Sequence, residues 1–352
     1  VIFVGALIAA STGIVGATVI AMGLISLPIM LSRSYDPSLS AGTICATGTL
    51  GQIIPPSIAL VILGDVLSAA YQQSQLNIGN FSARTVSVGD LFMGALIPGI
   101  ILVFCYALYV IIRAYLSPQM APSQKTEIIE GRWKIMLTSL LPPFVLISSV
   151  LGSILLGIAT PTEAAGVGAL GAILLAVSKK SLNRKNLTEA VETTTEITAM
   201  VFMILLGSSI FSLVFRGFGG DDLITGIFTE LPGGAFGAVL LVMVIIFLLG
   251  FILDFIQITL VVVPIVGPAL LMLGVDPIWL GIMIAINLQT SFLTPPFGFA
   301  LFYLRGVAPD TLATKDIYRG VIPFILIQIG LLIALAIFPE LVTALPEAVY
   351  GN

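Results

Sequence analysis

The chain has 352 residues, of which 58% are hydrophobic and only 9% are charged, so the expected solvent is lipid. The 14 basic and 18 acidic residues nearly cancel, and the basic ones fall in short clusters, which argues against a nucleic-acid partner. His is absent and only Cys45 and Cys105 occur, which argues against a disulfide framework and a transition-metal site. We therefore expect neither an enzyme nor an organic cofactor.

Apolar runs of about the 20 residues that cross a bilayer recur along the chain. Those that predict regular spanning helices are 91–112, 135–156, 162–177, 197–215 and 321–338. Four further runs are broken by Gly and Pro: 1–31, 40–70, 239–273 and 279–304. Such interruptions are typical of secondary transporters, in which broken helices line a site at mid-membrane.

The charged segments between these runs predict the orientation and the helix starts. Basic clusters at 113–134 and 179–185 are expected on the cytoplasmic side. In Thr160-Pro161-Thr162-Glu163, the spacing predicts a capped helix start, with Glu163 as a cap rather than a ligand. The charged stretch 182–196 predicts either a helix at the membrane surface or a solvated connector.

Proline spacing reveals an internal repeat. Pro28, Pro37, Pro55 and Pro56 recur 240 residues later as Pro268, Pro277, Pro295 and Pro296. Asp36 and Asp276 precede the second proline of each set, which predicts two helices with an Asp cap and Pro in the first turn. The offset maps Leu241 onto Val1, so the first repeat lacks a counterpart of 197–240, and we expect at least one upstream helix.

Charge indicates that the two repeats are inverted. Arg33 lies in the loop before the first Asp-Pro helix, whereas the loop around Gly274 has no basic residue. The later loops show the opposite bias. Arg84 is the only basic residue of 71–89, whereas 305–319 carries Lys315 in addition to Arg305 and Arg319. We predict an all-α polytopic membrane protein with repeat 1 at 1–115, scaffold helices with an interfacial arm at 116–196, and repeat 2 at 197–352. The expected re-entrant hairpins are 11–31 and 241–273, and the expected broken helices are 40–70 and 279–304.

The Pro-Pro steps are candidate cation sites. Paired prolines donate no backbone hydrogen bonds, so carbonyl groups are freed near mid-membrane and must find partners. Na⁺ suits carbonyl and hydroxyl oxygens, and hydroxyls lie beside the breaks at Thr49, Ser57, Ser291 and Thr294. The alternative is a kinked helix whose hydroxyls bond to its own carbonyls.

The hairpin tips are candidate anion sites. Polar or Gly-rich centres occur at 11–16 and 250–257, and a half-helix that starts there aims its amides at the midplane. The substrate-binding candidates are Ser11, Thr12, Gln52, Ser57, Asp254, Gln257 and Asn287. Each could instead join helices together, and Asp254 could cap a helix at the tip.

These segments resemble the large permease subunit of tripartite ATP-independent periplasmic (TRAP) transporters, the DctM-like family. The resemblance rests on segments 11–23, 35–37, 48–57, 159–165 and 293–296. It implies an elevator-type carrier of the bacterial inner membrane, driven by Na⁺. It also implies three partners: a small four-helix membrane subunit, a periplasmic substrate-binding protein, and an organic anion substrate.

The resemblance further implies one Na⁺ between each hairpin tip and the adjacent break. The first site would comprise Thr12, Val15, Gly51, Ile54 and Pro56. The second would comprise Gly250, Ser291, Thr294 and Phe297. Many of these residues would bind through backbone carbonyls.

Three other functions remain to be weighed. A stand-alone Na⁺/dicarboxylate symporter of related architecture would need no binding protein. An intramembrane hydrolase is opposed by the absence of His and of a Ser-Lys pair on a plausible helix. A channel would need rings of polar residues along a pore, whereas the two breaks predict two discrete sites.

Overall fold

The computed structural model describes residues 1–81, 85–122 and 132–350, and the regular structure in these ranges is helical. The elements are α1 (Ile2–Thr12), α2 (Val15–Ser32), α3 (Pro37–Thr49), the 3-10 turn η1 (Leu50–Gln52), α4 (Ile58–Asn77), α5 (Val88–Leu116), α6 (Arg132–Leu155), α7 (Pro161–Ser178), α8 (Arg184–Gly217), α9 (Gly220–Glu230), α10 (Gly234–Leu249), α11 (Phe255–Val261), α12 (Val263–Met272), α13 (Pro277–Leu293), α14 (Phe299–Val307), α15 (Thr314–Ile337) and α16 (Glu340–Tyr350). The predicted all-α class is confirmed.

Among the described residues, six helices are long and apolar enough to cross a membrane: α2, α5, α6, α7, α8 and α15. The pairs α9–α10, bent by 119°, and α11–α12, bent by 55°, would raise the number to eight. Five of the six contain the spanning helices that the sequence predicts, and α2 is an arm of the first hairpin. The chain is therefore a polytopic membrane protein.

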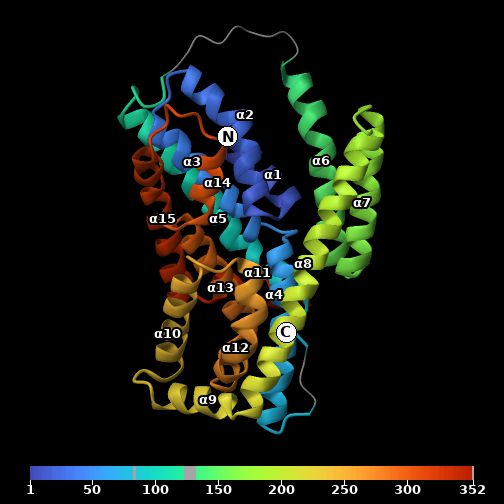
Figure 1. The fold of residues 1–352 in the computed structure, drawn as a ribbon, viewed down its shortest axis with the longest axis vertical. Helices are drawn as coiled ribbons and strands as arrows, with labels where there is room; N and C mark the ends of the chain where they lie inside the picture. The colour runs from blue at the N-terminus through green and yellow to red at the C-terminus, as the bar shows by residue number, and fades with distance from the viewer. Residues whose placement is uncertain (82–84, 123–131, 351–352) are drawn as a thin grey trace.

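The two halves of the chain run in opposite directions (Figure 1). The α1–α2 hairpin opens toward the upper end of the view, and the hairpin formed by α10 with α11 and α12 opens toward the lower end. Their tips meet near the middle of the molecule. This is the inverted topology that the charge pattern predicts.

Equivalent residues start the central helices of both halves. The carboxylates of Asp36 and Asp276 accept hydrogen bonds from Leu39 N and Trp279 N, at 2.9 and 2.7 Å. Each aspartate is the N-cap of a helix with Pro in its first turn, so both predicted caps are confirmed. The second arms of the two hairpins differ. In the second half this arm is divided at Val262, close to Pro264, into α11 and α12. In the first half Leu24 occupies the position equivalent to Pro264, and the arm is the continuous helix α2.

Both central helices stop before their paired prolines. Helix α3 ends at Thr49 and, after η1, regular structure resumes only with α4. Helix α13 ends at Leu293 and is followed by α14. The peptide bonds Pro55–Pro56 and Pro295–Pro296 are both cis, so the two breaks share their backbone form as well as their sequence. The predicted interruption of both helices is confirmed.

The broken helices form the core of the fold. Every residue from Leu39 to Thr49 in α3 and from Leu280 to Leu293 in α13 is buried. Helix α3 lies so close to α15 that a Cβ on Gly42 would stand 2.0 Å from the carbonyl oxygen of Gly320. Small residues permit this approach, as is usual where helices pack in a membrane.

Helices α6, α7 and α8 stand beside this core and are mostly exposed (Figure 1). Thr160 and Glu163 cap α7 reciprocally: Glu163 N donates to the Thr160 hydroxyl at 3.3 Å, and Thr160 N donates to the Glu163 carboxylate at 2.9 Å. The predicted cap is confirmed. The charged stretch 182–196 is not a separate element, because most of it is the beginning of the continuous 34-residue helix α8.

Most basic residues of the described chain lie at one end of the molecule. Basic residues accompany the α2–α3 link, the end of α5, the α7–α8 link and the start of α15, which all lie toward the upper end in Figure 1. Acidic residues accompany α9 and the starts of α7 and α13 at the opposite end. The positive-inside rule makes the upper end cytoplasmic. Arg84 and Lys125, which the sequence argument also used, lie outside the described residues.

Candidate functional site

The first hairpin turns at Gly13. Its φ is 62°, a left-handed conformation that favours glycine, and its N–H donates to the Ala9 carbonyl at 2.9 Å. The Thr12 hydroxyl lies 2.6 Å from the hydroxyl of Thr18, so two polar side chains meet at the tip. Ser11, in contrast, is exposed, and its hydroxyl donates to the Ile8 carbonyl at 2.8 Å.

The first break leaves backbone oxygens free. Within the described residues, no backbone N–H donates to the carbonyls of Gly51, Ile54 or Pro56. The Ser57 hydroxyl donates to the carbonyl of Gln52 at 2.9 Å, which closes the loop across the break. Free carbonyls are costly in hydrocarbon, by several kcal/mol each, unless a ligand or water satisfies them.

The first tip lies directly on this break. A Cβ on Gly13 would stand 3.2 Å from Ile58 N, and a Cβ on Gly51 would stand 3.0 Å from the carbonyl oxygen of Ala9. Both glycines are thus required by the close approach of two backbones. The structure thereby brings together the two segments that hold Thr12, Val15, Gly51, Ile54 and Pro56.

The second tip is built differently, on an acidic cap. Helix α10 ends at Leu249 with Gly250 as its C-cap, and Asp254 is the N-cap of α11 and accepts a hydrogen bond from Phe255 N. In return, Asp254 N donates to the Gln257 side-chain oxygen at 3.1 Å. Asp254 and Gln257 therefore form a capping box, the structural role that the sequence left open for Asp254.

Ser291 connects the second tip to its broken helix. Its hydroxyl donates to the carbonyl oxygen of Phe247, near the end of α10, at 2.8 Å. A Cβ on Gly250 would stand only 2.5 Å from the Ser291 oxygen. A hydroxyl that donates its proton keeps its lone pairs, so the Ser291 oxygen can still bind a cation.

The second break offers similar oxygens. The Thr294 hydroxyl donates to the Thr290 carbonyl at 2.8 Å and retains its lone pairs. Within the described residues, no backbone N–H donates to the carbonyls of Gly250 or Phe297. Gly250, Ser291, Thr294 and Phe297 therefore supply carbonyl and hydroxyl oxygens along the second tip and the break that follows it.

A cavity of about 270 Å³ separates the two tips. It is lined by Gly13, Ile14, Val15, Gly16, Gln52, Ile58, Ala59, Ile197, Met200, Asp254, Phe255, Ile256, Phe292, Phe299 and Tyr303. The side-chain oxygen of Gln52 is buried and has no hydrogen-bond partner among the described residues. Such a group is available to a polar ligand, because leaving it unpaired costs free energy.

Helix N-termini surround this cavity. The starts of α2, α4, α11 and α14 all contribute lining residues. Only α11 is capped by a side chain, that of Asp254, whereas the N-caps Ile14, Ser57 and Gly298 make no side-chain cap bond. The first-turn amides and the positive ends of three helix dipoles therefore face a common space, which favours an anion.

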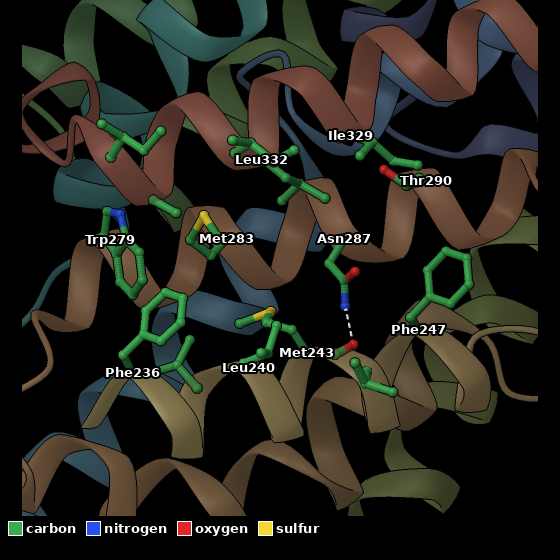
Figure 2. Close-up of a pocket in the computed structure, with 15 residues that line it drawn as sticks. Phe236, Leu240, Met243, Phe247, Trp279, Met283, Asn287, Thr290, Ile329 and Leu332 are labelled. Atoms are coloured by element: carbon green, nitrogen blue, oxygen red, sulfur yellow. Dashed lines mark hydrogen bonds between the residues drawn. The ribbon is translucent and has the colours of Figure 1, made fainter. Parts of the chain in front are cut away.

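Asn287 lies elsewhere, on an apolar groove of about 490 Å³ between α10, α13 and α15 (Figure 2). Its side-chain nitrogen donates to the carbonyl of Met243 at 2.8 Å, which ties α13 to α10. Thr290 lines the same groove. Of the seven substrate candidates, Gln52 and Asp254 line the cavity between the tips, while Ser11, Thr12, Ser57, Gln257 and Asn287 do not.

The sequence analysis did not predict a buried cluster of polar side chains. Gln289 and Gln328 each direct their side-chain nitrogen at the Thr49 hydroxyl, at 3.3 and 3.5 Å. Gln328 also donates to the Tyr106 hydroxyl at 2.8 Å. The sequence shows that Thr49 and Gln289 occupy equivalent positions of the two repeats, because they are 240 residues apart. The alignment of prolines does not show that their side chains meet.

Two opposed hairpins, each seated on a helix broken at paired prolines, define an inverted-repeat membrane carrier. The family model for the tripartite ATP-independent periplasmic transporter, DctM component, matches residues 1–341, so the chain belongs to this family. It is a TRAP transporter large permease subunit and a multi-pass protein of the bacterial inner membrane. The resemblance seen in the sequence is confirmed.

Curated relatives cover several substrates. The chain is 29% identical to the C4-dicarboxylate TRAP transporter large permease protein DctM of Pseudomonas aeruginosa, over 97% of this chain and 75% of that protein. It is 28% identical to the sialic acid permease SiaM of Vibrio cholerae, over 94% and 72%. It is 27% identical to the ectoine/5-hydroxyectoine permease UehC of Ruegeria pomeroyi, over 97% and 75%.

Proposed function

We propose that the chain couples the inward movement of Na⁺ to the import of a small organic acid, and that it acts as a carrier rather than an enzyme. A periplasmic binding protein delivers the acid, and a small four-helix membrane subunit completes the transporter. The observation that carries this proposal is the pair of tip-to-break contacts of opposite orientation on either side of one cavity.

The oxygens at each contact support Na⁺ as the coupling ion. At the first break, no backbone N–H of the described residues donates to the carbonyls of Gly51, Ile54 and Pro56, and the Ser291 and Thr294 hydroxyls lie near the second tip and break. Hard cations prefer such neutral oxygen ligands. Binding would satisfy groups that otherwise remain unpaired in a low-dielectric interior.

The cavity supports an organic anion as the substrate. Three uncapped helix starts offer amides to a carboxylate, and Gln52 offers a further polar contact. The carboxylate of Asp254 lines the same space and would repel an anion. Two Na⁺ ions at the tips would offset this repulsion, so the substrate would bind well only after the cations.

The contacts also support an elevator-type cycle. The first tip approaches the backbone after its break at Gly13, and the second tip approaches the Ser291 side chain on α13 at Gly250. Na⁺ would hold both tips closed over the substrate, and the closed unit would then cross the membrane as one body. Coupling follows because each ligand stabilises the conformation that the other needs.

Reconstitution tests this proposal. The permease and the small subunit are placed in liposomes, and uptake of C4-dicarboxylates, sugar acids and keto acids is measured with and without the binding protein and an inward Na⁺ gradient. We expect that one acid is taken up, and that its uptake requires both the binding protein and the inward Na⁺ gradient. Uptake that needs Na⁺ but no binding protein would instead indicate a stand-alone symporter, and uptake indifferent to Na⁺ would refute the coupling.

A further inference from the structure

A second polar cavity, of about 470 Å³, lies at the cytoplasmic end of the molecule. It is formed where the start of α3, the end of α5 and the start of α15 meet. Its lining is Asp36, Ser38, Leu39, Tyr109, Arg113, Met120, Arg319, Gly320 and Pro323. The hairpin tips contribute nothing to it, so it is distinct from the proposed transport site.

Two guanidinium groups in this cavity form no salt bridge within the described part of the chain. Among the described residues, the one salt bridge within 4 Å joins Arg216 to Asp221, and neither Arg113 nor Arg319 takes part in one. The Nε of Arg113 is buried without a hydrogen-bond partner among the described residues, and its Nη2 donates to the weakly accepting sulfur of Met120, at 3.0 Å. The site therefore carries positive charge that the described part of the protein leaves unsatisfied.

The single carboxylate in the wall is already engaged. Asp36 accepts from Leu39 N at 2.9 Å as the cap of α3, and its own N–H donates to the Met120 carbonyl at 2.9 Å. This backbone hydrogen bond links Met120 to the start of α3. Tyr109 is positioned by an edge-to-face contact with Phe324, with ring centroids 5.1 Å apart. Firmly packed walls of this kind preorganise the two arginines.

The equivalent described positions at the opposite end of the fold carry different side chains. The α5 and α15 segments align at Asp90 and Asp316, an offset of 316 − 90 = 226. At this offset Arg319 corresponds to Met93, and Tyr109 corresponds to Leu335. The side chains of the cationic cavity are therefore not repeated at the equivalent described positions of the other half.

We propose that this cavity binds the phosphate group of an anionic phospholipid from the cytoplasmic leaflet. Guanidinium groups match phosphate oxygens in a bidentate manner, and basic pockets between helices at this side of a membrane hold anionic headgroups. Exposed apolar side chains of the same helices, Ile112 on α5 and Ile322 on α15, lie within one turn of Arg113 and Arg319 and offer a surface to acyl chains. A bound headgroup would fasten α3 to α5 and α15.

The test measures lipid retention and thermal stability. The full chain is reconstituted in nanodiscs of phosphatidylcholine alone or of an equimolar mixture with phosphatidylglycerol, and bound lipid is counted by native mass spectrometry after release into detergent. We expect wild-type protein to retain phosphatidylglycerol and to melt at a higher temperature in the mixture. Arg319→Gln and Arg113→Lys should each reduce retention by about tenfold, because they remove a guanidinium fork.

Arg216→Gln is the matched control, since Arg216 is an exposed arginine on α8 that already has an acidic partner. It should retain lipid as wild type does. Loss of retention in Arg216→Gln, or unchanged retention in both cavity variants, would overturn the proposal. Inorganic phosphate added in detergent distinguishes the source: stabilisation by phosphate equal to that by phosphatidylglycerol would assign the site to a soluble anion and refute the lipid.

Discussion

The Thr49 hydroxyl accepts a hydrogen bond from the Gln289 side chain at 3.3 Å, although the two residues occupy equivalent positions of the two repeats. Each lies shortly before the paired prolines of its own broken helix. Where a residue touches its own counterpart, the axis that relates the repeats must pass close by. The two candidate cation sites are therefore disposed on either side of this pair.

This contact predicts a stability defect. Thr49→Val would remove the common acceptor of Gln289 and Gln328 and leave buried amide groups unpaired, at a cost of about 1–3 kcal/mol. We expect a lower melting temperature for the purified protein in detergent. Thr198→Val is the control, because this exposed threonine bonds only within α8. Equal melting temperatures for the two variants would show that the cluster contributes no stability.

The second cation site predicts a specific transport defect. Thr294→Ala removes a hydroxyl beside the break and should raise the half-saturating Na⁺ concentration roughly tenfold, as expected if one ligand contributes about 1.4 kcal/mol. The amount of protein in the membrane should change less. Thr290→Ala, one turn away and facing the groove of Figure 2, removes a similar helix-bonded hydroxyl and should leave Na⁺ dependence unchanged. An equal effect of both substitutions would refute the assignment.

The first tip predicts a requirement for glycine. Gly13 and Gly79 both have positive φ, of 62° and 80°, but a Cβ on Gly13 would meet Ile58 N at 3.2 Å, whereas one on Gly79 would meet nothing within 4 Å. Gly13→Ala and Gly79→Ala therefore impose a comparable backbone strain, and only the first also opens the tip-to-break contact. We expect uptake to be abolished by Gly13→Ala and retained by Gly79→Ala. Similar uptake by both variants would count against a role for this contact.

Gln52 predicts a change in substrate affinity. Its buried, unpartnered oxygen lines the cavity between the tips, so Gln52→Leu should raise the KM for the organic acid about tenfold, with a smaller change in Na⁺ dependence. Gln73→Leu, at a half-buried position on α4 outside this cavity, is the control. A KM equal to that of wild type would remove Gln52 from the substrate site.

Local chemistry made much of this fold predictable. Asp36-Pro37 and Asp276-Pro277 specify helix starts, and the prolines at 55–56 and 295–296 interrupt their helices, although the pair Pro142-Pro143 is accommodated inside α6. The position of Asn287 could not be predicted in this way. Helix α13 is buried on all sides, so hydrophobic periodicity does not reveal which of its polar residues faces the cavity.

The structure of 182–196 and the contact between Gln328 and Tyr106 could not be predicted from local sequence motifs. The charged stretch 182–196 contains no helix breaker, and its residues therefore continue into the spanning part of α8 although their composition differs. The pairing of Gln328 with Tyr106 joins residues 222 apart in sequence. Only the packing of α15 against α5 brings these two side chains together.

Direct measurement of Na⁺ binding by the purified permease tests the central claim most sharply. Equilibrium dialysis with radioactive Na⁺ should reveal two saturable sites, whose affinity rises when the transported acid is present. The double substitution Ser291→Ala with Thr294→Ala should remove one site and leave the other. Absence of saturable binding, or two unchanged sites in this variant, would contradict the account of cations held between hairpin tips and broken helices.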